Sequence, residues 1–229
     1  MALNIDDATR YIYQATFLQA ETTLAHFQHT RRIIEQLGLP DAIYTDGLSV
    51  FGNRPPSHDG SELRSQFQRA ITILGVGHIV ATDAPAKGKI ERRFQYWQDR
   101  FPKLCQIENI TTPDKAAPLL LDQVAWHNAN TICRTTGRTP IQAMEHAREH
   151  KLWSWRPTPP LDLAFAVYEK PRVNPDHTID FLGTPWPVAA TARKSVGIIH
   201  HPGQRFWVVE TLPDRRKPLW PTILAEYTL

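Results

Sequence analysis

The length of 229 residues is enough for one domain of about 100 to 150 residues together with a smaller one. The composition of 41% hydrophobic and 21% charged residues excludes a disordered chain. The sequence has no apolar run of about 18 residues and no signal peptide, so we expect a cytoplasmic protein without a membrane segment. The net charge of +3 divides into −3 over residues 1–83, +2 over residues 84–133 and +4 over residues 134–229, a distribution compatible with a metal site followed by a polyanion-binding surface.

The first part of the chain alternates between short strands and helices. Residues 2–5 and 11–18 predict a β-hairpin whose turn contains Asp6 and Asp7. Residues 20–37 carry apolar side chains at near-helical spacing, and the helix that they predict ends at Gly38 and Pro40. The apolar run 42–45 predicts a buried strand with Asp46 at its carboxyl end.

The pattern continues with a helix over residues 61–74, capped by Ser61, and a strand over residues 78–80. A helix that contains Glu91 follows Pro85. Two more helices begin with a threonine cap and a proline, at Thr112-Pro113 and at Thr139-Pro140. Strands followed by a helix–strand alternation predict an α/β domain with a mixed sheet over residues 1–150.

Residues 151–163 contain the sequence WSWRPTPP and predict a linker rich in proline and tryptophan. After it, short extended runs are separated by turn signals at residues 174–176 and 202–203. The runs are residues 164–167, 178–181, 186–189, 196–199 and 206–209. We therefore predict a small all-β barrel or sandwich over residues 164–229.

Two carboxylates are candidate metal ligands because each is placed on a rigid element. Asp46 follows a predicted strand, Glu91 lies in a predicted helix, and 44 residues separate them. Magnesium prefers oxygen ligands, and two such ions on either side of a phosphate favour in-line displacement. Taken alone, either acid also fits a turn, a helix cap or a surface charge.

Several motifs together suggest a family. In chain order they are IDDATRYI, FLQAETT, YTDG, AKGKIERRF and HNAN followed by GRTPIQA. Their order and approximate spacing over about residues 2–147 resemble the integrase cores of insertion-sequence DDE transposases and retroviral integrases.

The resemblance implies an RNase H-like mixed-sheet fold, an Asp-Asp-Glu triad with two Mg²⁺ or Mn²⁺ ions, and the nicking and transfer of DNA strands. Asp46 matches the second acid of the triad and Glu91 matches the third. The family's first Asp lies on an opening strand before the segment that resembles IDDATR, so we expect an N-terminally truncated core. Asp6 and Asp7 match a position after the second strand, where the usual role is to hydrogen-bond a turn.

Four basic residues flank Glu91, namely Lys87, Lys89, Arg92 and Arg93. On one side of a helix they suit either phosphate binding or a solvated face, and the resemblance favours phosphate binding. Asn128 resembles an Asn that often follows the aromatic residue of this region in the family, and a structural role on the helix surface fits equally well.

Other residues that can carry chemistry favour structural roles. Cys105 and Cys133 lack CxxC spacing and paired histidines, so we expect ordinary core residues without zinc or a disulfide. His200 and His201 are expected at a turn or surface. The tryptophans at 97, 126, 153 and 155 are expected to pack the core and the domain junction.

The β region 164–229 loosely resembles the SH3-like barrels that follow many transposase cores. Its basic residues suit salt-sensitive DNA binding; they are Arg193, Lys194, Arg205, Arg215, Arg216 and Lys217.

Three hypotheses for function follow. The first is a DNA transposase fragment that acts with magnesium on transposon ends and target DNA, as a homo-oligomer associated with the bacterial nucleoid. The second is a catalytically inactive DNA-binding or regulatory remnant that lacks the first catalytic Asp. The third is an RNase H-like nuclease that acts by hydrolysis alone.

Overall fold

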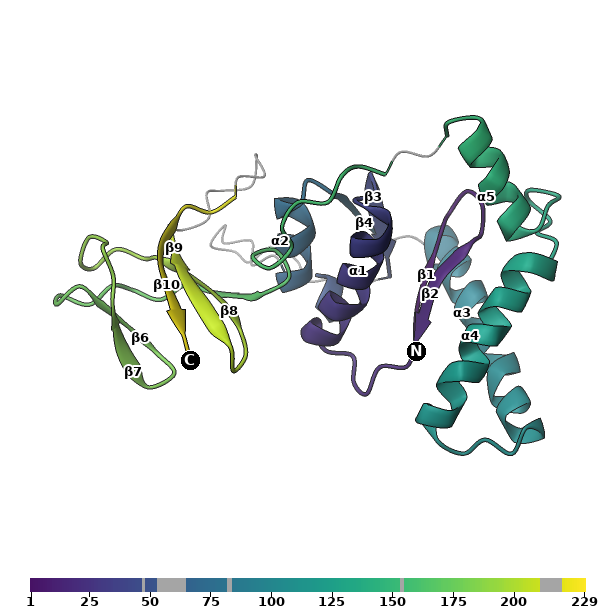
Figure 1. The fold of residues 1–229 in the computed structure, drawn as a ribbon, viewed down its shortest axis with the longest axis horizontal. Helices are drawn as coiled ribbons and strands as arrows, with labels where there is room; N and C mark the ends of the chain where they lie inside the picture. The colour runs from purple at the N-terminus through teal and green to yellow at the C-terminus, as the bar shows by residue number, and fades with distance from the viewer. Residues whose placement is uncertain (47, 53–64, 82–83, 153–154, 211–219) are drawn as a thin grey trace. The chain divides into compact units, whose positions relative to one another are not determined.

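The computed structural model describes the 229-residue chain apart from residues 47, 53–64, 82–83, 153–154 and 211–219. It has a mixed α/β architecture, as predicted, and two compact units (Figure 1). The described strands of residues 1–150 form two separate two-stranded sheets, β1-β2 and β3-β4, and not the single mixed sheet that was predicted. Unit 1 comprises Met1–Leu48 and Ile79–Pro157, and unit 2 comprises Ser49–His78 and Thr158–Leu229. The division into residues 1–150, 151–163 and 164–229 remains a prediction about independently folding domains.

Unit 1 begins with the predicted hairpin. Strands β1 (Ala2–Ile5) and β2 (Ile12–Thr16) pair in antiparallel orientation. The Asp6 carboxylate holds the turn, because its Oδ1 accepts hydrogen bonds from the backbone N–H groups of Thr9 (2.7 Å) and Ala8 (3.1 Å). The predicted Asp-containing turn is confirmed.

Helix α1 (Thr23–Leu37) starts three residues later than predicted. Its N-cap is Thr22, whose hydroxyl accepts a backbone hydrogen bond of 3.2 Å from inside the first turn. Gly38 ends the helix with φ of +98°, and a Cβ there would collide with the carbonyl oxygen of Arg156. Only glycine combines this backbone conformation with so close an approach.

A second two-stranded sheet is formed by β3 (Ala42–Thr45) and β4 (Gly77–Val80). The backbone N–H of Ala81 extends the contact between these segments by donating to the Thr45 carbonyl oxygen at 2.9 Å. The bounds of β3 are those predicted, but its predicted burial is wrong. Thr45 is buried, whereas the Tyr44 side chain is exposed.

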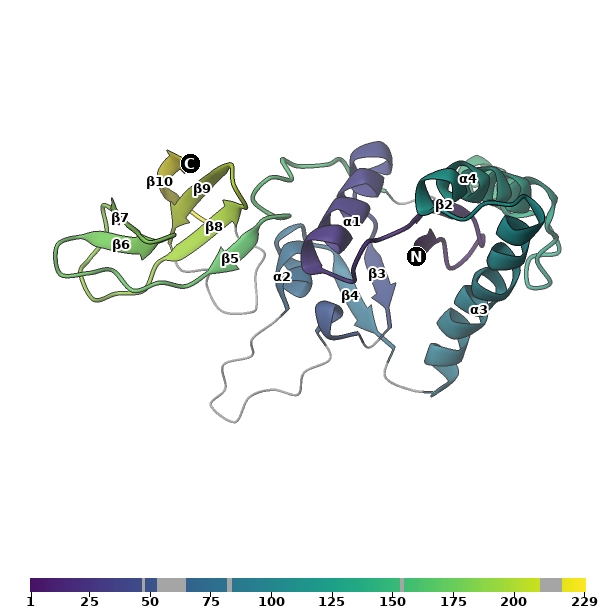
Figure 2. The same cartoon turned by 90° about the horizontal axis from the view of Figure 1, so that it is seen from below.

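Three helices complete unit 1: α3 (Ala84–Ile107), α4 (Pro113–Asn130) and α5 (Pro140–Glu149). The last two begin at the predicted prolines. Helix α4 contacts both α3 and β2 (Figure 2). The core between the hairpin and these helices contains Ile12, Ala15, Trp97, Phe101, Ala116, Leu120 and Val124.

Unit 2 contains most of the strands. The antiparallel sheet with the order β10-β9-β8-β5 is built from β5 (Val167–Glu169), β8 (Gly197–His201), β9 (Arg205–Val209) and β10 (Ile223–Thr228). A separate hairpin is formed by β6 (Thr178–Phe181) and β7 (Thr184–Pro187). Within the described residues these sheets do not close into a barrel. Both pack on a shared core of Val173, Ile179, Phe181, Val188, Val196, Ile198, Phe206 and Val208.

Helix α2 (Gln66–Ile73), preceded by the short 3₁₀ helix η1 (Ser49–Phe51), also belongs to unit 2. The predicted start at Ser61 is wrong. The cap is Ser65, which exchanges hydrogen bonds with Gln68 in a capping box, and Ser61 lies outside the described residues.

Helix α2 is tied to the segment before β5. The Arg69 guanidinium is buried and donates to the carbonyl oxygens of Ala164 (2.9 Å) and Ala166. The Gln66 side chain exchanges hydrogen bonds of 2.7 and 2.9 Å with the backbone of Tyr168. These bonds explain why α2 groups with the strands of unit 2.

Candidate functional site

Asp46 follows β3 directly, as predicted. Its side chain is half-buried, and its Oδ1 accepts a hydrogen bond of 3.2 Å from the backbone N–H of Leu48. Thr45, the residue before it, is buried and paired through its carbonyl oxygen with Ala81. The strand therefore holds the backbone of Asp46 in place, and a local turn orients the carboxylate.

Glu91 lies near the start of α3 with an exposed side chain. Asp46 and Glu91 belong to the same compact unit. The basic residues predicted to flank Glu91 occupy the same helix, but their side chains lie outside what the structure describes; they are Lys87, Lys89, Arg92 and Arg93. The joint metal site of Asp46 and Glu91 stays a prediction.

Asp6 and Asp7 serve the first hairpin. Besides the two backbone bonds, Asp6 Oδ1 accepts a bond of 2.8 Å from the Thr9 hydroxyl, and its Oδ2 accepts one of 3.2 Å from the Tyr13 hydroxyl. Asp7 forms an ion pair of 2.7 Å with Arg10. Burial of the Tyr13 hydroxyl next to the Asp6 charge raises the pKa of Tyr13 well above its usual range. Both carboxylates thus have the structural role expected of a turn.

Asn128 is buried in α4, so the place on the helix surface, one of the two alternatives for this residue, is wrong. Its side-chain amide donates to the Ile12 carbonyl oxygen at 2.9 Å and accepts from the Ile12 N–H at 3.0 Å. Asn128 therefore joins α4 to β2. The sequence contains no signal for such a partner, because 115 residues separate the two.

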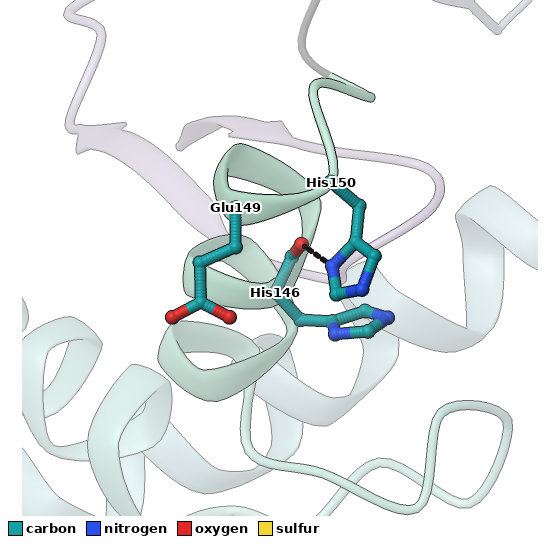
Figure 3. A group of neighbouring side chains, drawn as sticks. All are labelled: His146, Glu149 and His150. Atoms are coloured by element: carbon teal, nitrogen blue, oxygen red, sulfur yellow. Dashed lines mark hydrogen bonds between the residues drawn. The ribbon is translucent and has the colours of Figure 1, made fainter.

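The sequence interpretation missed a cluster at the end of α5. Within the described part of the chain, His146, Glu149 and His150 offer ligand atoms that all lie within 4.8 Å of one another. Figure 3 shows the two imidazole rings lying against each other, with the Glu149 carboxylate to one side. The signal was present in the sequence, because positions i, i+3 and i+4 share one face of a helix.

Other predicted placements vary. Trp97 is buried as expected, whereas Trp126 is 49% exposed, so its expected role in the core is wrong. Cys105 and Cys133 are half-buried free thiols. Arg205, one of the basic residues of the β region, forms an ion pair of 3.0 Å with Asp162.

Two curated proteins are similar to this chain. The protein y4bF of Sinorhizobium fredii, whose name assigns it provisionally as a transposase, is 33% identical over 110 residues, which are 48% of this chain and 24% of y4bF. The transposase for insertion sequence IS1202 of Streptococcus pneumoniae is 32% identical over 130 residues, 55% of this chain and 28% of that protein. The chain thus resembles transposases over about half of its length and spans about a quarter of theirs.

No family model matches the chain. Among the helices in the described residues, none has both the length and the apolarity needed to cross a bilayer.

Proposed function

We propose that the chain is part of a DNA transposase and contributes Asp46 and Glu91 to metal-dependent cleavage and transfer of DNA strands. The observation that carries this proposal is the similarity to two transposases over about half of the chain. We further propose an RNase H-like core for residues 1–150 and an SH3-like barrel for residues 164–229. The first of these proposals is supported by the mixed α/β architecture of the chain, and the second by the antiparallel strands β5–β10, which share one apolar core.

The chemistry of the two side chains supports a magnesium or manganese site. Carboxylate oxygens are the ligands that these hard cations prefer, and when bound such ions stabilise the charge on the attacking and leaving oxygens of a phosphate. Asp46 is held at the end of β3 by strand pairing and by its bond to Leu48. Glu91 is solvent-exposed on α3 and is therefore accessible to a metal and to DNA.

DNA is the partner proposed for this site, both as transposon ends and as target. The basic residues of α3 beside Glu91 would bind phosphates and bring the scissile strand to the carboxylates. Transposases of the type that the chain resembles generally act as multimers on paired DNA ends, so we propose a homo-oligomer that works on the nucleoid in the bacterial cytoplasm.

The experiment measures nicking and strand transfer on duplex DNA that carries the ends of the element, with Mg²⁺ or Mn²⁺. We expect Asp46→Asn and Glu91→Gln each to lower the rate at least about a hundredfold, because each removes a charged metal ligand. The matched controls are Asp41→Asn, before β3, and Asp99→Asn, an exposed acid of α3. Unchanged activity in Asp46→Asn or Glu91→Gln would overturn the proposed site.

A second candidate function is DNA binding without catalysis. The observation that favours it is the engagement of Asp6 in its turn, because a carboxylate with both oxygens hydrogen-bonded does not readily supply a third metal ligand. DNA binding by the 229-residue chain without divalent-metal-dependent cleavage would support this candidate over the first.

A further inference from the structure

The last turn of α5 places three metal-binding side chains on one face of a helix. His146, Glu149 and His150 come at positions i, i+3 and i+4, and their ligand atoms lie within 4.8 Å of one another. Ligands around a tetrahedral ion with bonds of about 2.1 Å are separated by about 3.4 Å. The side chain of Glu149 is exposed and therefore has room to rotate toward the two rings.

The hydrogen bond of His150 prepares its ring for metal binding. The Nδ1 of His150 lies 2.9 Å from the carbonyl oxygen of His146, which can only accept, so Nδ1 carries the proton and donates (Figure 3). In the neutral tautomer that carries its proton on Nδ1, the lone pair is on Nε2. Metal-binding histidines commonly hold their second ring nitrogen in this way, through a backbone carbonyl group.

The imidazole rings of His146 and His150 lie close together, and the Glu149 carboxylate lies near them. The ring centroids of His146 and His150 are 4.0 Å apart, so two imidazolium ions there would repel each other. One divalent ion can instead bind both rings at once.

We propose that His146, Glu149 and His150 bind one divalent late-transition-metal ion, such as Zn²⁺ or Ni²⁺. Two imidazoles and one carboxylate suit these ions better than they suit Mg²⁺, which prefers oxygen ligands alone. This site is therefore separate in chemistry from the proposed carboxylate pair, and neither proposal depends on the other. An ion that joins residues 146 and 150 would fasten the last turn of α5, with water in the remaining coordination position.

The experiment titrates the 229-residue chain with Zn²⁺ against a chromophoric chelator. We expect one equivalent bound at this site and, in the double variant His146→Gln/His150→Gln, a dissociation constant at least about tenfold higher. Glu149→Gln should also weaken binding, because an amide oxygen is a poorer ligand than a carboxylate. Glu145→Gln, on the same helix, should leave binding unchanged.

A second measurement does not depend on variants. Paramagnetic Ni²⁺ should broaden the ring NMR signals of two of the ten histidines, His146 and His150, at the lowest metal concentrations. Earlier broadening of other histidines would overturn the proposal, as would equal zinc binding by the double variant with its helix content intact. Excess Mg²⁺ should not displace the bound zinc.

Discussion

The side chain of Asn128 pairs with both backbone groups of Ile12, through bonds of 2.9 and 3.0 Å. Both residues are buried, with 5% and 2% of their surface exposed. In a strand with an uncovered edge, these two backbone groups would bind water or another chain. Asn128 instead uses them to attach the first hairpin to α4, beside the apolar core of unit 1.

We predict that Asn128→Ala lowers the free energy of unfolding by about 2 kcal/mol, because it breaks two bonds and leaves buried backbone groups without a partner. Asn130→Ala is the matched control. Its amide donates to the Trp126 carbonyl oxygen at an exposed position of the same helix, and the expected change is below about 0.5 kcal/mol. Urea unfolding of the two variants checks the difference, and equal stabilities would contradict the structural role of Asn128.

Arg69 is expected to stabilise the fold of unit 2. Burial lowers the pKa of Arg69 to about 10, yet its guanidinium stays charged at pH 7 and donates to buried carbonyl oxygens before β5. Replacing it with Ala should cost about 3 kcal/mol, since bonds to charged donors contribute about 1.5 to 3 kcal/mol each. Arg31→Ala, which removes an i, i+4 ion pair of α1, should cost less than about 0.5 kcal/mol in the same unfolding experiment.

Acid should destabilise unit 1 through His29. Burial, with smaller effects of His26 and Arg32, lowers the pKa of His29 to about 4, against an ordinary value of 6.5. Its Nε2 is hydrogen-bonded to Asn4, and its buried Nδ1 has no partner among the described residues. The unfolded chain therefore takes up the proton first as the pH falls from 6.5 to 4, and stability falls over that window.

We expect the free energy of unfolding to fall by about 2 kcal/mol between pH 7 and pH 4.5, and we expect this fall to be absent in His29→Gln. Unfolding measured at both pH values checks this difference, and His150→Gln, at an exposed position, serves as the control. An unchanged pH dependence in His29→Gln would show that another group is responsible.

The basic residues near Glu91 are expected to determine the salt dependence of DNA binding. Each phosphate contact contributes about 0.9 to the slope of log K against log salt concentration. Replacing Lys87, Lys89, Arg92 and Arg93 together with Gln should therefore lower the slope by about 3 to 4. Lys103→Gln, an exposed lysine farther along α3, should leave the slope within about one unit of the original in fluorescence anisotropy titrations. If replacing all four residues leaves the slope unchanged, these residues form a solvated helix face and do not bind phosphates.

Local capping chemistry made several helices predictable. The helices that start at Pro113 and Pro140 begin where the preceding threonine and the proline place them, because both signals act within one turn. The capping-box rule also identifies the start of α2. Ser65 has a glutamine three residues later, as a capping box requires, whereas Ser61 has an arginine there.

Strand positions in the β region were harder to predict, since they depend on pairing with distant segments. The sequence of β7 begins Thr-Pro, and proline disfavours a strand, so the predicted run began two residues too late. The run 164–167 overlaps β5 by one residue, because the carbonyl groups of Ala164 and Ala166 bind Arg69 instead of continuing a strand. Strand β10 was not predicted at all.

In the candidate site, too, the features set by neighbouring residues were predictable, and those set by contacts between distant segments were not. The position of Asp46 after a strand and that of Glu91 on a helix were predictable from apolar periodicity. The burial of Asn128 was not predictable from the sequence, because it depends on a hydrogen-bond partner in another element. The cluster on α5, in contrast, follows from local spacing alone, because positions i, i+3 and i+4 share one face of a helix.

In the proposed site, Asp46 and Glu91 hold the same metal ions. Fe²⁺ with ascorbate cuts a protein backbone next to the bound ion, and the double variant His146→Gln/His150→Gln keeps the imidazole cluster from contributing. We predict cuts near residues 46 and 91 that Mg²⁺ suppresses and that Asp46→Asn weakens at both positions. Cutting at only one position, or cutting near residue 91 that Asp46→Asn leaves unchanged, would contradict a shared site.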